Sequence, residues 1–140
     1  MTLETIIFKE ELPTNEEYWD LFLTTGWNNQ YKLSIGEIDD ALNNSWYSVS
    51  VYDSGKLVGF GRVISDGIQH AFIVDLIVRP DYQGKGLGYK ILDLLVIQCK
   101  ARKIRDIQLF SAKDKCGFYE KYGFEKRPED APGMQIKYLY

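Results

Sequence analysis

The segment from Ile77 to Leu92, IVRPDYQGKGLGYKIL, constrains the fold most, because it joins a strand-like run to a helix-like run through three glycines. A glycine inside a helix is about 1 kcal/mol less favourable than an alanine, so three glycines beside a helix start indicate a requirement on the backbone. The first turn of a helix has unpaired N–H groups and a partial positive charge, and glycine has no β-carbon to block a ligand. We therefore predict an anion site that fits a phosphate group. The alternative is a tight turn without a ligand.

Two widespread phosphate-binding loops do not match this segment. A Walker A loop requires Ser or Thr after Gly-Lys, but here Gly84-Lys85 is followed by Gly86. A Rossmann GxGxxG loop requires a third glycine, and counting from Gly84 the pattern meets Tyr89 instead. Asp106 lies about twenty residues further on, where that fold places an acid that binds ribose. We discount it, because the strands before the loop are predicted to be antiparallel.

Hydrophobic periodicity and turn residues predict ten elements in the order β, α, α, β, β, β, α, β, α, β. The predicted strands cover residues 5–11, the two arms of a hairpin within 46–67, and residues 70–78, 106–112 and 134–140. The first predicted helix follows the turn at residues 13–15 and is ended by Gly26. The other predicted helices cover residues 34–45, 86–103 and 115–123. Ser34 and Glu37 form a predicted capping box, and the strand at 70–78 is expected to be buried on both faces. This order predicts an α/β domain with a mixed sheet, antiparallel early and with a βαβ crossover late.

Length and composition bound the class of protein. The chain has 140 residues, of which 45% are hydrophobic and 26% charged, and this fits one soluble domain over residues 1–140. The net charge of -3 disfavours nucleic-acid binding and slightly favours a cationic substrate. Cys99 and Cys116 lack the spacing of a zinc site, so we predict no metal. Without a signal peptide or an apolar run of about 20 residues, we expect a cytoplasmic protein that does not bind a membrane.

Three segments in order, DLIVRP, QGKGLG and GFYEKYGF, resemble the GNAT superfamily of N-acetyltransferases. The signature loop of that family has Gln or Arg, two residues, Gly, one residue, and Gly or Ala, which correspond here to Gln83, Gly86 and Gly88. The resemblance covers roughly residues 57–124. It implies a GNAT-like α/β fold, with a mixed, mostly antiparallel sheet, a splayed parallel strand pair and flanking helices. It also implies a small bacterial-type enzyme that takes acetyl-CoA as its co-substrate.

The resemblance assigns the cofactor-binding residues. Backbone N–H groups from the loop and first helical turn would hold the pyrophosphate of acetyl-CoA, with Lys85 and Lys90 either adding charge or simply solvated. The strand segment before the loop would pair with the pantetheine arm. The residues concerned are Leu76, Ile77, Val78, Gln83, Gly84, Lys85, Gly86, Leu87, Gly88 and Tyr89.

The implied reaction is direct attack of an amine on the thioester, and the amine must first lose a proton. The family positions for a Glu or His base correspond to Phe72 and Val74, which are apolar. Asp75 is the only carboxylate in that strand, so we predict that Asp75, or a water chain ending on it, takes the proton. Strand alternation would point Asp75 away from the side of Val74 unless the splay turns it. The alternative is that Asp75 orders the backbone or binds a nearby helix. His70 is expected to be a turn residue.

Two further roles follow from the resemblance. A backbone N–H near Ile77 or Val78 would stabilise the developing oxyanion. Tyr119 matches the family tyrosine that faces the sulfur and would assist the leaving thiolate, and the alternative is a core aromatic residue. Cys116 lies three residues earlier without an activating base and is interpreted as a bystander.

The acceptor is the least defined part of the prediction. The N-terminal region carries six aromatic residues, of which Trp27 and Tyr31 are the best candidates for an amine pocket; the others are expected to fill the core. We favour a small-molecule amine, with a protein lysine or N-terminus, or a non-catalytic acetyl-CoA-binding module, as alternatives. A homodimer through the apolar C-terminal strand at 134–140 is a further expectation.

Overall fold

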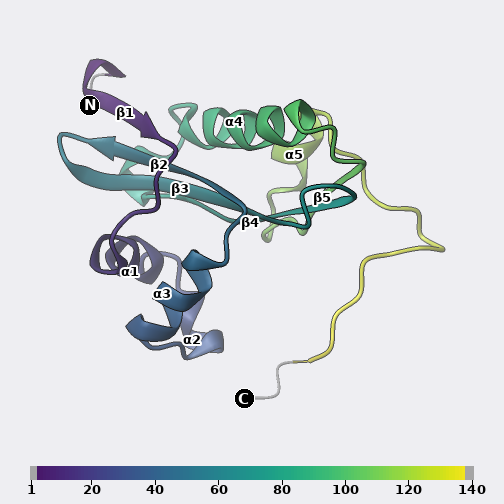
Figure 1. Ribbon diagram of the computed structural model, residues 1–140, viewed down its shortest axis with the longest axis horizontal. Coiled ribbons are helices and arrows are strands. Elements are labelled where there is room, and N and C mark those ends of the chain that lie inside the picture. Colours follow the sequence, from purple (N-terminus) through teal and green to yellow (C-terminus); the bar gives the residue numbers. More distant parts are fainter. Residues whose placement is uncertain (1–2, 138–140) are drawn as a thin grey trace. The chain divides into compact units, whose positions relative to one another are not determined.

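The computed structural model describes residues 3–137, which form two compact units. The first unit ends at Gln108 and the second begins at Leu109. Five strands form one sheet in the order β1-β2-β3-β4-β5, mostly antiparallel with one parallel pair (Figure 1). Their bounds are β1 Ile6–Lys9, β2 Tyr47–Asp53, β3 Lys56–Ser65, β4 His70–Val78 and β5 Asp106–Leu109. The predicted α/β class with a mixed sheet is therefore confirmed.

The described residues also contain five α-helices: α1 Asn15–Leu23, α2 Asn28–Tyr31, α3 Ile35–Asn43, α4 Leu87–Ala101 and α5 Cys116–Tyr122. Short 3-10 helices occupy Leu3–Thr5 and Pro80–Tyr82. The predicted capping box of α3 is present, because the Ser34 side chain accepts from the Glu37 N–H while Glu37 accepts from the Ser34 N–H. A second capping box, formed by Thr14 and Glu17, starts α1. Both reciprocal pairs satisfy N–H groups that a helix start leaves unpaired.

Three expectations about elements were wrong. Helix α2 was missed, because its four residues are too short to show a period; it ends at Lys32, whose φ is +52°. Residues 134–137 form no strand, and the Met134 and Ile136 side chains are exposed; the rest of the predicted last strand lies outside the described residues. Strand β4 is not buried on both faces, since buried residues alternate with half-buried ones along most of its length.

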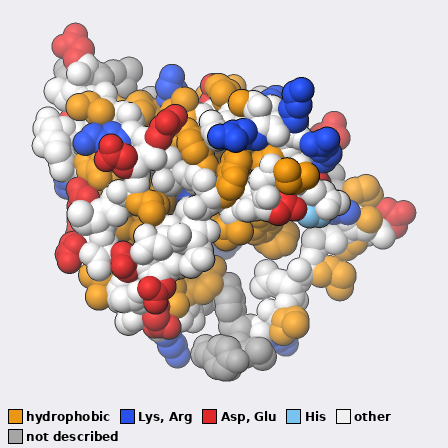
Figure 2. Space-filling view, in the orientation of Figure 1, with side chains coloured by type: hydrophobic (Ala, Val, Ile, Leu, Met, Phe, Trp, Pro, Cys, Tyr) orange, Lys and Arg blue, Asp and Glu red, His pale blue; other side chains and the backbone are white. Residues whose placement is uncertain are grey.

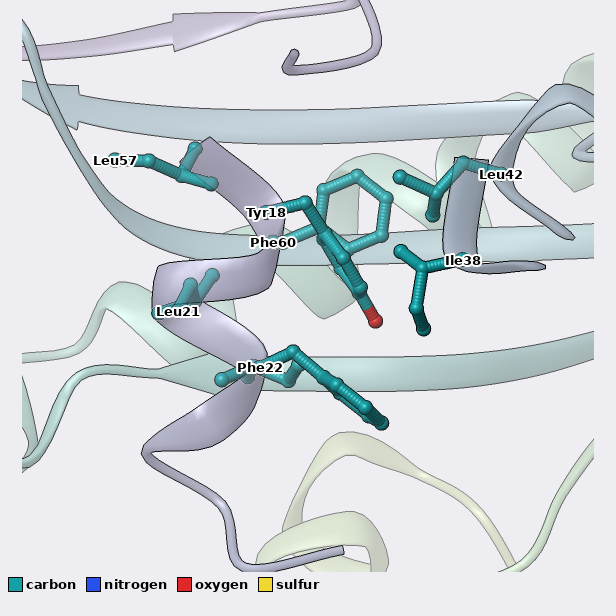
Figure 3. Close-up of a cluster of buried hydrophobic side chains, with 8 residues drawn as sticks. Tyr18, Leu21, Phe22, Ile38, Leu42, Leu57 and Phe60 are labelled. Carbon is teal, nitrogen blue, oxygen red and sulfur yellow. The ribbon is translucent and has the colours of Figure 1, made fainter. Parts of the chain in front are cut away.

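Helices α1 and α3 pack on one face of the sheet and close one half of the core. Figure 3 shows this cluster, in which Tyr18 on α1 meets Phe60 on β3 and stacks against Phe22 of the same helix. The Tyr18 and Phe60 rings meet edge to face at a centroid distance of 5.0 Å. The other buried members are Leu21, Ile38, Leu42, Leu57 and Ile77. Burial of so many large apolar side chains fixes the angle at which both helices lie against the sheet.

Helix α4 covers the opposite face, as Figure 1 shows. Gly59 and Gly61 on β3 allow this close approach, because an added β-carbon would lie 3.0 Å from Ile91 at Gly59 and 2.8 Å from Ile91 at Gly61. Leu95 is 2.9 Å from the same point at Gly61. The sheet therefore has a smooth strip on which the apolar stripe of α4 packs, and this packing fixes where the helix begins.

Candidate active site

The predicted anion site lies where the loop after β4 becomes α4. Gly84 and Gly86 have φ angles of +76° and +86°, in the left-handed region that favours glycine. A β-carbon built on either would meet no atom within 4 Å, so the space above both glycines is open. The first helical hydrogen bond runs from the Lys90 N–H to the Gly86 carbonyl, at 3.1 Å. The N–H groups of Leu87 and Gly88 therefore have no acceptor inside the helix.

The loop is fastened to the sheet by two side chains. The Gln83 side-chain amide donates to the Val78 carbonyl at 2.9 Å, which closes the loop across the 3-10 helix. Arg79 donates from its backbone N–H to the Val58 carbonyl at 2.8 Å and from its Nε to the Leu57 carbonyl at 2.7 Å. These bonds hold the glycines at the end of β4 without using their own N–H groups.

The other predicted loop residues differ in what they present to solvent. The Lys85 side chain is exposed and that of Tyr89 is 48% exposed, whereas Leu87 is buried against the core. Only the backbone of Leu87 can therefore face a ligand. The Lys90 ammonium lies 5.9 Å from the centroid of the Phe8 ring, so a cation is held close to the start of the helix.

Strand β4 contains a bulge just before its last three residues. Its register with β3 runs through the pairs Arg62–Val74 and Phe60–Ile77, so β4 has one residue more than β3 in this interval. Asp75 lies within the bulge and has a φ of +55°. That conformation is uncommon for residues other than glycine, although Asp and Asn adopt it more readily than most. The bulge breaks the alternation of side chains along the strand.

The Asp75 side chain forms an ion pair with Arg62. The Arg62 Nε lies 2.7 Å from Asp75 Oδ2, and the two side chains are 11% and 23% exposed. Because Arg62 is the cross-strand partner of Val74, their side chains share one face of the sheet, and the bulge turns Asp75 to the same side. The sequence-based alternation, which pointed Asp75 away from Val74, therefore fails here. The ion pair supports the alternative role, in which Asp75 orders the backbone.

The segment Leu76, Ile77 and Val78 follows the bulge and leads into the loop. Ile77 is 3% exposed and packs in the core beside α1, while Leu76 lies on the α4 side, 3.4 Å from a β-carbon built at Gly61. Each end of β4 is arranged differently: the Asp106 N–H donates to the Gln69 carbonyl at 2.8 Å, so β5 meets β4 at its start. The splay toward the end of β4, which the resemblance implies, stays a prediction.

The N-terminal aromatic residues divide between core and surface. Tyr18 and Phe22 are buried, and the half-buried Trp27 ring packs edge to face against Phe22 at 6.5 Å. Tyr31 is 47% exposed. Burial raises the pKa of the Tyr18 hydroxyl well above its ordinary value, and the negative charge of Asp75 raises it further. The Tyr18 hydroxyl therefore lies in the field of the Arg62–Asp75 pair.

Tyr119 lies on α5 in the second unit. Its ring meets those of Phe118, at a centroid distance of 5.0 Å, and Phe124, at 6.1 Å, both nearly perpendicular. Burial raises the pKa of the Tyr119 hydroxyl above its ordinary value, so this hydroxyl stays protonated at neutral pH and can donate a hydrogen bond. Cys116 begins the same helix and is half-buried.

The remaining titratable candidates are peripheral. His70, expected to be a turn residue, is the exposed first residue of β4, and its Nδ1 lies 3.5 Å from Asp106 Oδ2. Burial raises the pKa of the Cys99 thiol. Within residues 3–137 no group of three or more His, Cys, Asp or Glu side chains could hold a metal ion. No helix in that range is long and apolar enough to span a bilayer.

Comparison with known proteins decides the family. The model of the acetyltransferase (GNAT) family matches residues 10–124. The chain belongs to the GNAT family. An "uncharacterized N-acetyltransferase ycf52" of Pyropia yezoensis is 36% identical over 135 residues, which cover 84% of this chain and 78% of that protein. A probable acetyltransferase of Staphylococcus aureus, solved as a crystal structure, is 30% identical with a TM-score of 0.82, over 95% of this chain and 99% of the other.

Two further GNAT relatives have names that state an acceptor. A "histone acetyltransferase TAP1" of Glycine max is 31% identical over 95% of this chain and 62% of its own. A "serotonin N-acetyltransferase 2, chloroplastic" of Oryza sativa subsp. japonica is 33% identical over 64% of this chain and 45% of its own. The chain thus spans less than two thirds of either relative. Together, family and relatives show that this GNAT protein is an acyltransferase.

Two arginines that fasten this GNAT site were not singled out from the sequence. Arg62 holds the bulge of β4, and Arg79 holds the start of the loop and lies 2.6 Å from an Asp20 carboxylate oxygen. A signal was available for each, because a charged residue stands in an otherwise apolar strand at Arg62 and directly after one at Arg79. A charge in such a place usually has a partner.

Proposed function

We propose that this GNAT protein transfers the acetyl group of acetyl-CoA to a primary amine, and that the acceptor is a small cationic molecule. One observation carries the use of acetyl-CoA. The loop of Gly84 and Gly86 has an open surface and left-handed glycines, and the N–H groups of Leu87 and Gly88 have no acceptor inside the fifteen-residue helix α4. Such an array binds a pyrophosphate through backbone donors and the helix dipole, and a side chain at either glycine would fill the cradle.

The distribution of charge supports a cationic acceptor. Residues 10–45, which include α1, α2 and α3, hold eight acidic side chains and one lysine, whereas the rest of the chain holds twelve acidic and sixteen basic ones. Figure 2 shows the acidic side chains spread over the side of the molecule that carries α1 and α3. A field of this sign raises the local concentration of a cation. Trp27 and Tyr31 would add cation–π contacts to an ammonium group.

The chemistry requires the amine nitrogen to become neutral before it attacks. An amine of pKa about 10.4 is protonated at pH 7, and removing that proton costs roughly 4–5 kcal/mol. The nitrogen lone pair then attacks the thioester carbonyl carbon, the C–N bond forms, the C–S bond breaks and the thiolate leaves. Water takes the proton of the ammonium group before the attack and the second nitrogen proton as the amide forms, and by family resemblance the Tyr119 hydroxyl would donate a hydrogen bond to the departing sulfur. A backbone N–H near Ile77 or Val78 would stabilise the oxyanion.

A protein lysine is the second candidate acceptor. The name of the Glycine max relative, which matches over 95% of this chain, favours it, and an acidic surface suits a basic peptide as well as a small amine. The name of the Oryza sativa relative favours a small amine instead. The choice between the two therefore depends on a measurement with both kinds of acceptor.

The decisive test measures free CoA thiol released from acetyl-CoA in the presence of small amines and lysine peptides, with an amine-free reaction as control. We expect amine-dependent release that is fastest with a small aromatic or aliphatic amine. Faster release of CoA with the lysine peptides would indicate that the acceptor is a protein lysine. No release by a protein that binds acetyl-CoA would contradict transfer to these amines and favour a binding module.

Tyr119→Phe tests the predicted proton donor. We expect the turnover number to fall roughly 100-fold, as for loss of a general acid, while the affinity for acetyl-CoA changes little because the ring remains. The measurement compares turnover with direct binding of acetyl-CoA. Phe118→Leu, which alters the neighbouring ring without removing a hydroxyl, is the matched control. Unchanged turnover in Tyr119→Phe would exclude the role.

A further inference from the structure

The bulge of β4 has an unusual support. Arg62 extends from β3 toward α3, and its Nη1 lies 3.1 Å from the Ala41 carbonyl and 3.4 Å from Ser45 Oγ, while its Nε bonds Asp75 at 2.7 Å. One guanidinium therefore joins the bulge, the neighbouring strand and the end of a helix. With only 11% of the Arg62 side chain exposed, water cannot easily replace these bonds.

The conformation of Asp75 needs such a support. A φ of +55° is unfavourable for a side chain with a β-carbon, and residues held in this way persist when their surroundings determine them. The left-handed turn at Asp75 also sets the direction in which Leu76, Ile77 and Val78 leave the bulge. Those three residues are the ones predicted to pair with the pantetheine arm.

We propose that Arg62 and Asp75 act together as a positioning pair that holds β4 in the shape required for acetyl-CoA, and that the Asp75 carboxylate is not the general base. The pair acts through the backbone of Leu76, Ile77 and Val78 rather than on the reacting atoms. This role of the pair rests on the proposed use of acetyl-CoA. Its test therefore measures the binding of acetyl-CoA and the hydrogen exchange of the β4 backbone separately.

The test compares three substitutions of the pair. Asp75→Asn keeps an oxygen that can accept from Arg62 and a residue type that tolerates positive φ, but it cannot act as a base. Asp75→Ala removes both properties, and Arg62→Met removes the donor. Asp106→Asn, which breaks the exposed pair with His70 at the other end of β4, is the matched control.

For each variant we would measure the dissociation constant of acetyl-CoA, the turnover number and the hydrogen exchange of the amides at residues 76–78. The control should stay within a few-fold of the wild type in all three, and Asp75→Asn should lie closer to the wild type than to Asp75→Ala in each. Asp75→Ala and Arg62→Met should bind acetyl-CoA about 10-fold more weakly, as expected for a small displacement of a binding segment, with faster exchange at residues 76–78. If Arg62→Met does not fold, the Asn and Ala variants give the same comparison.

Two results would contradict the proposed positioning role of Arg62 and Asp75. Turnover lost in Asp75→Asn as completely as in Asp75→Ala, with unchanged affinity for acetyl-CoA, would make Asp75 the base. Unchanged affinity and exchange in both Asp75→Ala and Arg62→Met would mean that the pair positions nothing. Failure of the wild type to bind acetyl-CoA would instead contradict the proposed function, and hydrogen exchange would still decide whether the pair holds the strand.

Discussion

Two pairs of glycines serve this protein in opposite ways. At Gly59 and Gly61 the backbone is ordinary, but a β-carbon would collide with side chains of α4. At Gly84 and Gly86 the space is open, but the backbone is left-handed. The first pair lets a helix pack closely on the sheet, and the second leaves room for something that is not protein. The difference separates glycines needed by the fold from glycines available to a ligand.

The largest effect is expected at the open pair. In Gly86→Ala the new methyl group would occupy the cradle and disturb hydrogen bonds to a charged group, each worth about 1.5–3 kcal/mol. We expect the affinity for acetyl-CoA to fall roughly 100-fold. Titration calorimetry with the folded variant measures this directly.

The strain of the substitution itself must be separated from the loss of binding. A left-handed alanine costs roughly 1–2 kcal/mol of stability. Gly55, in the hairpin turn, also has a positive φ of +84° and nothing within 4 Å of an added β-carbon. Gly55→Ala should lose similar stability and keep its affinity for acetyl-CoA. Equal losses of affinity in both variants would remove the distinction between the two kinds of glycine.

At the packed pair the effect should be on stability. Gly61→Val places atoms where Ile91 and Leu95 already lie, and overpacking of this kind costs about 3 kcal/mol at its upper end. We expect the Tm to fall by roughly 10 °C, while the folded fraction still binds acetyl-CoA within a few-fold of the wild type. A melting temperature equal to that of the wild type would show that α4 moves away at little cost.

A smaller effect on acetyl-CoA binding distinguishes the contribution of side-chain charge from that of the backbone N–H donors at Gly84 and Gly86. Lys85 lies between the two glycines and its side chain is exposed. An exposed ion pair with a phosphate contributes little, so Lys85→Gln should weaken binding of acetyl-CoA roughly 3-fold and reduce its dependence on salt. Binding would be measured at low and high salt. If Lys85→Gln lost as much affinity for acetyl-CoA as Gly86→Ala, the binding would depend on the lysine charge rather than on the backbone donors.

The smallest effect is on stability, in a loop that contributes to the fold and is not part of the proposed site. The Asp66 carboxylate accepts hydrogen bonds from the backbone N–H groups of Ile68, Gln69 and His70. These bonds lower the pKa of the Asp66 carboxyl. A lowered folded-state pKa adds stability above the unfolded value, and this stability is lost as the pH falls through the folded value. Asp66→Asn should therefore melt a few degrees lower at pH 7, and the difference should begin to shrink once the pH falls below about 4, the pKa of an unfolded Asp. A difference that stays constant with pH would contradict this cause.

The sequence predicted the elements that depend on local patterns. Three predicted features depend only on neighbours along the chain: the end of β4 before Pro80, the capping box at Ser34 and the apolar stripe of α4. Each of these predictions was confirmed within a few residues. The glycine loop was located for the same reason, because its left-handed residues are glycines. Family resemblance then added roles that the described structure leaves as predictions, including those of Tyr119 and Gln83.

The features that escaped prediction depend on pairing between strands. The bulge at Asp75 exists because β4 has one residue more than β3 between two cross-strand pairs, and no local pattern in HAFIVDLIV shows which residue is the extra one. The side of the sheet on which Asp75 lies, and its partner Arg62, follow from that bulge.

The central claim is that the open glycines bind the pyrophosphate of acetyl-CoA. The most direct test is to titrate the wild type and Gly86→Ala with acetyl-CoA and with S-acetylpantetheine, which lacks the pyrophosphate. We expect the wild type to bind acetyl-CoA at least about 100-fold more tightly than S-acetylpantetheine, and Gly86→Ala to remove most of this difference. Equal affinity of the wild type for both ligands, or an equal loss for both in the variant, would contradict it.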